Sequence, residues 1–158
     1  MRKPVASLVL MPLVLVLVVS ACSSDQTTSE PSAGSTQPAA GTQVGVADTK
    51  LGKILTDATG RTLYAFTVDK GGNSACYQQC AKAWPALTVK GEPTAGEGLQ
   101  SSLLGTTTRT DGTTQVTYKG MPLYHFAGDT KPSDTNGQGL NKVWWVLAPD
   151  GSLVKSAP

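Results

Sequence analysis

The sequence repeats itself at a distance of sixty residues, and this internal repeat constrains the fold more than any other feature. Tyrosine, phenylalanine, aspartate and tryptophan recur together, so each half, residues 50–91 and 110–151, is expected to form the same supersecondary unit. A single unit leaves an apolar face uncovered, and we expect the two to pack together as one domain over residues 44–158. The recurring residues include Gly60, Leu63, Tyr64, Phe66, Asp69, Lys82, Trp84, Leu87 and Gly91, which match Gly120, Leu123, Tyr124, Phe126, Asp129, Lys142, Trp144, Leu147 and Gly151.

Within each half, the residue pattern predicts strands joined by short turns. Asp111-Gly112, between two threonine-rich runs, is typical of a type I′ turn, in which both residues have positive φ. A single short helix is expected over residues 74–83, stopped before Pro85. The predicted fold is mainly β: two tandem related antiparallel β repeats with one short helix in the first repeat. Hairpins are expected for residues 54–57 with 62–66, 106–110 with 113–117, 114–118 with 122–126, and 143–147 with 152–154.

The start of the chain has the features of a bacterial export signal. Two basic residues precede an apolar run, residues 5–19, that is shorter than the roughly 20 residues needed to span a bilayer. Residues 19–22, Val-Ser-Ala-Cys, resemble the lipobox of bacterial lipoprotein precursors, in which the cysteine becomes the lipidated N-terminus. We therefore expect a signal peptide over residues 1–21 and acyl chains such as palmitate on Cys22. The alternative is an ordinary secretory leader with a chance cysteine.

Residues 23–43 are rich in Ser, Thr, Pro, Ala, Gly and Gln and hold no aromatic residue, so they are expected to form a flexible tether. The chain has 13 Lys and Arg against 11 Asp and Glu. Removal of Arg2 and Lys3 with the signal peptide makes the two counts equal, so nucleic acid is not an expected partner. The expected location is the extracytoplasmic face of the cell membrane, with the lipid anchor as the contact to the membrane.

Two segments share one motif: residues 64–69, Tyr-Ala-Phe-Thr-Val-Asp, and residues 124–129, Tyr-His-Phe-Ala-Gly-Asp. Both resemble the Y-x-[FWY]-x-x-D motif of a family of bacterial lipoproteins, the "secreted repeat of unknown function". The resemblance extends to the Cys76 and Cys80 pair and to Trp84-Pro85, although Ala86 stands where many members carry a second proline. It implies tandem copies of one fold unit and an extracytoplasmic location, and the family has no established activity.

The aromatic residues of each motif lie two positions apart, so Tyr64 and Phe66, like Tyr124 and Phe126, are expected to point to one face of a strand. Asp69 and Asp129 follow in loops, where a carboxylate accepts hydrogen bonds from turn amides or from a tyrosine hydroxyl. An active site needs one copy of a motif, whereas this motif occurs twice. We therefore expect these six residues to define the fold, with ligand binding as the alternative.

Cys76 and Cys80 are expected to form a disulfide, because a close pair outside the cytoplasm is normally oxidised. Residues four apart on a helix lie near the upper limit of disulfide geometry, so the bridge requires an irregular turn. The second half has Asn136 and Leu140 at these positions, so the fold unit does not need the bridge. A structural staple is the main hypothesis. The alternative is redox activity, although the C-x3-C spacing differs from the C-x-x-C of thioredoxin-like proteins.

Three further features carry weaker hypotheses. His125, the sole histidine, and Met121 are soft ligands for copper, but no third ligand is apparent. The oxygen-rich loop 128–137 fails the calcium-loop pattern, because Trp145 stands at the twelfth position counted from Asp134, where an EF-hand needs glutamate. Trp145 is also expected at the surface, as a platform for an envelope glycan. Neither a metal nor a cofactor is expected.

The sequence therefore predicts a membrane-anchored extracytoplasmic lipoprotein of unknown molecular activity, acting as a binding or envelope-structural module. No nucleophile accompanied by a base and an orienting group can be named, so an enzyme is not expected. The alternative is a cell-surface redox or electron-transfer protein that uses Cys76 and Cys80.

Overall fold

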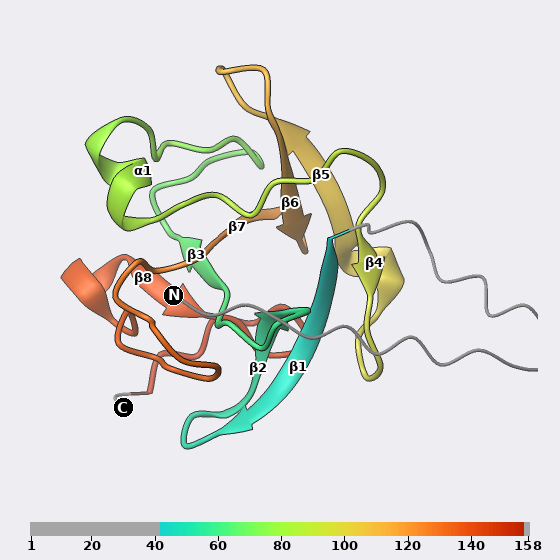
Figure 1. Ribbon diagram of the computed structural model, residues 1–158, viewed down its shortest axis with the longest axis vertical. Helices are drawn as coiled ribbons and strands as arrows, with labels where there is room; N and C mark the ends of the chain where they lie inside the picture. The colour runs from blue at the N-terminus through green and yellow to red at the C-terminus, as the bar shows by residue number, and fades with distance from the viewer. Residues whose placement is uncertain (1–41, 157–158) are drawn as a thin grey trace, which may run out of the picture. The chain divides into compact units, whose positions relative to one another are not determined.

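Two β-sheets form the framework of the domain in the computed structural model, which describes residues 42–156 (Figure 1). The expected signal peptide, Cys22 and residues 23–41 of the expected tether lie outside the described residues. A mainly β fold with one short α-helix in the first repeat is confirmed. Within residues 42–156, no helix has the length and apolar character needed to cross a membrane.

The first sheet has the order β2-β1-β4. β1 (Gln43–Thr49) and β2 (Gly52–Asp57) form an antiparallel hairpin, and β4 (Thr94–Ala95) pairs in parallel with the start of β1. β1 was not expected from the sequence. The signal in the sequence is Gly45, which matches Gly105 sixty residues later. A Cβ on Gly45 would lie 3.4 Å from the Thr56 hydroxyl, and a Cβ on Gly105 would lie 3.2 Å from the Thr117 hydroxyl, in each case on the neighbouring strand.

The second sheet has the order β5-β6-β7-β3-β8, with antiparallel pairing throughout. At its centre, β3 of the first repeat pairs with β7 of the second, and Tyr64 lies opposite Tyr124. These tyrosines are equivalent residues of the two repeats, so the halves face each other across an approximate two-fold axis. The strands are β3 (Tyr64–Phe66), β5 (Leu104–Thr108), β6 (Thr114–Tyr118), β7 (Met121–Tyr124) and β8 (Trp144–Val146).

The centre of the second sheet is buried on both faces, because side chains along β3 and β7 alternate between two apolar clusters. Leu63, Ala65 and Leu123 join an aliphatic cluster that also includes residues of the first sheet. Tyr64 and Tyr124 join an aromatic cluster on the other face, with both phenylalanines of the motifs packed against it. The expected division of each motif between two faces is confirmed.

The helix is shorter than expected. α1 spans Gln79–Ala83, whereas the sequence suggested residues 74–83. Gln78 precedes it with a φ of 49°, a left-handed conformation that does not continue a helix. The N–H of Ala75 bonds to the carboxylate of Asp69, so a side chain holds this segment as part of the loop before the helix. The other helical turns are of the 3-10 type, η1 (Ser101–Leu103) and η2 (Leu140–Lys142).

Three of the expected hairpins form, namely β5 with β6, β6 with β7, and β8 with the segment around Leu153. The fourth is wrong beyond its turn: Thr56 bridges to Thr62, but β2 and β3 then enter different sheets. The type I′ turn is also wrong, because Gly112 has a positive φ and Asp111 does not. The reason is loop length, since the N–H of Arg109 bonds to the carbonyl of Thr113 and encloses three residues rather than two.

Candidate functional site

The two motif phenylalanines and the two repeated tryptophans form one aromatic column. Trp84 and Trp144, equivalent residues of the two repeats, stack with ring centroids 3.8 Å apart and planes within 2° of parallel. Phe66 of the first repeat stacks on Trp144 of the second at 4.1 Å, and Phe126 of the second packs on Trp84 of the first at 4.5 Å. Each repeat therefore completes the aromatic packing of the other.

The motif tyrosines and aspartates also pair across the repeats. The Tyr64 hydroxyl donates to Oδ2 of Asp129 at 2.7 Å, and the Tyr124 hydroxyl donates to Oδ2 of Asp69 at 2.7 Å. We call these two reciprocal hydrogen bonds the cross-lock. The expectation that the carboxylates accept from tyrosine hydroxyls was correct in kind, but each partner belongs to the other repeat.

The second oxygen of each carboxylate holds the loop that follows its own strand. Oδ1 of Asp69 accepts from the N–H of Ala75 at 2.7 Å, and Oδ1 of Asp129 accepts from the N–H of Asn136 at 2.9 Å. Burial raises the pKa of both carboxyl groups above the ordinary value of 3.8. Burial and the facing carboxylates likewise raise the pKa of both tyrosines far above 10, so the hydroxyls stay protonated as donors.

Each cross-lock tyrosine also accepts a hydrogen bond. The N–H of Gly137 donates to the Tyr64 oxygen at 3.2 Å. The Tyr124 oxygen lies 2.7 Å from Oγ of Ser74, and since the single tyrosine proton goes to Asp69, the serine is the donor here. Gly137 is sterically required, because a Cβ at this position would lie 2.7 Å from the Trp84 ring.

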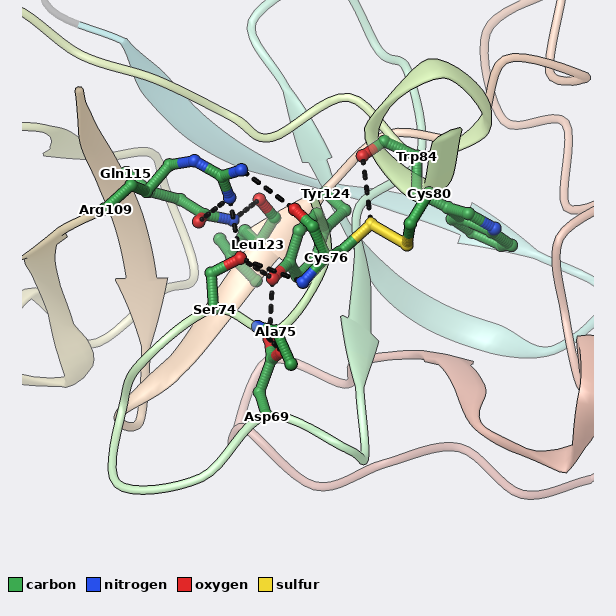
Figure 2. Close-up of a disulfide and its surroundings, with 10 residues drawn as sticks. All are labelled: Asp69, Ser74, Ala75, Cys76, Cys80, Trp84, Arg109, Gln115, Leu123 and Tyr124. Atoms are coloured by element: carbon green, nitrogen blue, oxygen red, sulfur yellow. Dashed lines mark hydrogen bonds between the residues drawn. A yellow bond between two sulfur atoms is a disulfide. The ribbon is translucent and has the colours of Figure 1, made fainter. Parts of the chain in front are cut away.

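A disulfide and a buried arginine lie next to the cross-lock (Figure 2). Cys76 and Cys80 are bonded, with Cα atoms 5.2 Å apart, and Cys76 precedes α1, so the expected irregular turn is present. Arg109, only 5% exposed, reaches into this loop from the β5–β6 hairpin. It donates to Oγ of Ser74 at 2.7 Å and to the carbonyl of Cys76 at 2.8 Å.

Arg109 also lies over the Tyr77 ring, with its guanidinium carbon 4.4 Å from the ring centroid. Hydrogen bonds from Thr110 lower the pKa of the exposed Tyr77 phenol. Arg109, Ser74 and Tyr124 thus form a continuous hydrogen-bonded chain from the disulfide loop to the cross-lock. Arg109 was not expected from the sequence. Its only signal there is that it is the lone cation of a threonine-rich hairpin, and the equivalent residue of the first repeat is Thr49.

The family to which these features belong is identified by comparison. A family model described as a secreted repeat of unknown function matches the chain twice, over residues 45–88 and 105–148. The two matches cover more than half of the sequence. The chain belongs to this family. No curated protein and no solved structure matches the chain.

As a secreted repeat, the protein is extracytoplasmic, and its molecular activity is unknown. The two matched segments correspond to the two halves that meet at β3 and β7. They include both copies of the Tyr, Phe and Asp motif and both stacked tryptophans. The family's repeat therefore contains all the residues that form the cross-lock and the aromatic column in this protein.

The residues considered as weaker metal-site candidates in this secreted-repeat protein contact other parts of the domain. Nε2 of His125 lies 3.5 Å from Oδ2 of Asp57, and burial lowers the pKa of His125. Met121 packs against the aliphatic cluster. In residues 42–156, no three His, Cys, Asp or Glu side chains are placed to hold a metal ion. In the loop 128–137, Asp134 accepts hydrogen bonds from its own loop.

The tryptophans of the second repeat differ in exposure. Trp144 is 2% exposed within the aromatic column, whereas Trp145 is half-buried. Trp145 is therefore partly accessible, and the glycan hypothesis stays a prediction. The first repeat has Pro85 at this position.

Proposed function

We propose that this secreted-repeat protein is anchored to the outer face of the cell membrane through lipid on Cys22. Its domain would act as a non-catalytic binding or envelope-structural module. The cross-lock is the main support for a non-catalytic module, because the most chemically reactive groups of the motif are engaged in holding the two repeats together. Function then belongs to surfaces and cavities of the assembled domain.

The engagement of the carboxylates supports a structural role for them. Each motif carboxylate accepts from a tyrosine hydroxyl through one oxygen and from a loop N–H through the other. A general acid or base must reach a substrate proton, and a nucleophile must reach a substrate carbon. Asp129 is 4% exposed, so it reaches neither.

The anchor rests on the sequence of residues 19–22, Val-Ser-Ala-Cys, after an apolar run. Each buried methylene of an acyl chain adds about 0.8 kcal/mol of membrane binding, and stable attachment takes two or more chains. A lipobox cysteine receives a diacylglyceryl group on sulfur, which supplies two. The tether then places the domain away from the bilayer surface.

Metabolic labelling with an alkyne analogue of palmitate tests the anchor. We expect label on the wild-type protein and on the Cys76→Ala/Cys80→Ala double variant, and none on Cys22→Ala. In a detergent phase separation, the wild-type protein and the double variant should enter the detergent phase, and Cys22→Ala should stay in the aqueous phase. Equal labelling of the Cys22→Ala variant would disprove the proposed attachment site.

A second candidate function is redox chemistry at the disulfide. The observation in its favour is that Cys80 is half-buried while Cys76 is fully buried, so Cys80 is the more accessible end of the bridge. The reduction potential distinguishes the candidates. A value below about −300 mV supports a staple, and a value near or above about −200 mV, with the fold intact after reduction, favours redox function.

The glycan hypothesis is tested separately. Trp145 is partly exposed, and aromatic faces bind the apolar faces of sugars. We expect Trp145→Ala to reduce retention on purified peptidoglycan. Equal retention of both proteins would refute a role for this ring.

A further inference from the structure

The two repeats make the same contact at two equivalent places, but with different residues. Gly60 meets Pro132 in one half: a Cβ on Gly60 would lie 3.2 Å from Cβ of Pro132. The equivalent residues of the other contact are Gly120, which corresponds to Gly60, and Gly72, which corresponds to Pro132. A Cβ on Gly72 would lie 3.4 Å from the Gly120 carbonyl oxygen. A proline ring therefore fills one contact, and no side chain fills the other.

The unfilled contact is part of a cavity of about 310 Å³. This volume is at the lower end of the range typical of small-molecule sites. The cavity lies where segments of both repeats meet. Its lining consists of Ala65, Phe66, Thr67, Asp69, Gly71, Gly72, Gly120, Met121, Pro122 and Leu153.

The cavity begins where the pairing of β3 and β7 stops. Their register ends at Ala65 opposite Leu123, and the next residue of β7 is Pro122. Proline has no N–H to donate to the neighbouring strand, so the ladder does not continue. The equivalent residue of the first repeat is Thr62, which is buried. The two halves thus differ both in the strand and in the loop that borders the cavity.

We propose that this cavity binds a small, mainly apolar molecule that carries one ammonium group. This inference rests on the proposed binding function and adds to it the class of ligand. The lining includes the apolar residues Phe66, Met121 and Leu153. Asp69 is the one ionisable residue of the lining, and no lysine or arginine lines the cavity.

Asp69 has capacity left for a ligand. Its two oxygens offer about four lone-pair positions in total. Tyr124 and the N–H of Ala75 occupy two of them, at 2.7 Å each. The remaining positions suit the N–H groups of an ammonium ion, whose charge would neutralise the carboxylate, whereas a carboxylate ligand would be repelled. The equivalent Asp129 has Lys131 and Pro132 in the loop positions of Gly71 and Gly72.

Three probes of similar size and different charge test the proposal: phenethylamine, 2-phenylethanol and 3-phenylpropanoate. Each is titrated into the mature chain, residues 22–158, with Cys22→Ala to prevent lipidation, and amide shifts are recorded by NMR. We expect phenethylamine to shift the amides of Gly71, Gly72 and Gly120. It should bind about tenfold or more tightly than the other two probes.

A matched pair of variants checks the position. Thr67→Trp places a large ring at the exposed mouth of the cavity, and Ala127→Trp places the same ring at the equivalent exposed position of the other repeat. Thr67→Trp should weaken phenethylamine binding about tenfold or more, and Ala127→Trp should leave it unchanged. If a variant does not fold, the NMR shifts of the protein that keeps Thr67 still show where phenethylamine binds.

Shifts confined to other residues, equal binding of the anionic probe, or equal losses in both variants would overturn the proposal. The membrane anchor is measured independently by lipid labelling at Cys22. A protein that is labelled but does not bind the amine loses this inference and keeps the proposed anchor. A protein that binds the amine but is not labelled keeps the site and loses the anchor.

Discussion

Replacing Tyr64 by phenylalanine tests the cross-lock most directly. The substitution keeps the ring in the aromatic cluster, edge-on to Trp84, and deletes only the hydroxyl. That hydroxyl donates to the buried Asp129 carboxylate at 2.7 Å and accepts from the N–H of Gly137 at 3.2 Å. Both partners are left with a missing hydrogen bond in the interior.

The cost follows from these two bonds. A hydrogen bond to a charged group contributes about 1.5–3 kcal/mol, and an unpaired buried N–H costs about 1 kcal/mol or more. We therefore expect Tyr64→Phe to lower the free energy of unfolding by about 3 kcal/mol, roughly a hundredfold in the folding equilibrium. For a domain of this size, about 4 °C per kcal/mol gives a fall in Tm of about 12 °C.

Thermal and urea unfolding at pH 7 measure the effect, with Tyr118→Phe as the control. The Tyr118 hydroxyl donates to a neutral carbonyl, that of Pro149, so its loss should cost only about 1 kcal/mol. A double-mutant cycle with Asp129→Asn should then give a coupling of at least about 1 kcal/mol with Tyr64→Phe. A Tyr64→Phe variant as stable as Tyr118→Phe, or a coupling near zero, would show that the cross-lock does not hold the repeats together.

Three further substitutions or titrations test neighbouring features. In an alkaline titration followed by tyrosine absorbance, Tyr77 should ionise first, with a pKa below 10, while the cross-lock tyrosines should ionise only on unfolding. The free energy of unfolding should fall as the pH rises past about 10, because the unfolded chain then loses phenol protons that the folded chain retains. Gly137→Ala should cost about 3 kcal/mol through its clash with a tryptophan ring, whereas Gly91→Ala, which meets no atom within 4 Å, should cost less than about 0.5 kcal/mol in calorimetry. Cys76→Ala/Cys80→Ala should lower the free energy of unfolding in urea by about 2 kcal/mol, the value for so short a loop, and a stability equal to wild type would rule out a staple.

The sequence was sufficient for the parts of the fold that depend on local pattern. The sixty-residue repeat predicted two equivalent units, and the two-residue spacing of Tyr64 and Phe66 placed both in the aromatic cluster. The close pair Cys76 and Cys80 was correctly predicted to be bonded. Each of these inferences uses residues that are near one another in the chain or repeated at a fixed offset.

The partners within the site were beyond such reasoning. A repeat offset shows that Tyr64 and Tyr124 are equivalent, but it does not show whether each tyrosine bonds to the aspartate of its own repeat or of the other. That choice depends on the antiparallel pairing of β3 with β7, which places Tyr64 opposite Tyr124. Arg109 was missed for a related reason, since its partners Ser74 and Cys76 lie more than thirty residues away.

The approximate symmetry also explains where function is best sought in this protein. Contacts that both repeats make alike, such as the cross-lock and the stacked tryptophans, are required to join the halves and have little freedom to change. Departures from symmetry are not required by the joining of the repeats. The Cys76 and Cys80 bridge is one departure, and the Gly71-Gly72 loop, with its open cavity, is another. Both lie in the first repeat after Asp69, so the loop from residue 70 to 80 is the part of the fold in which we expect a specific function.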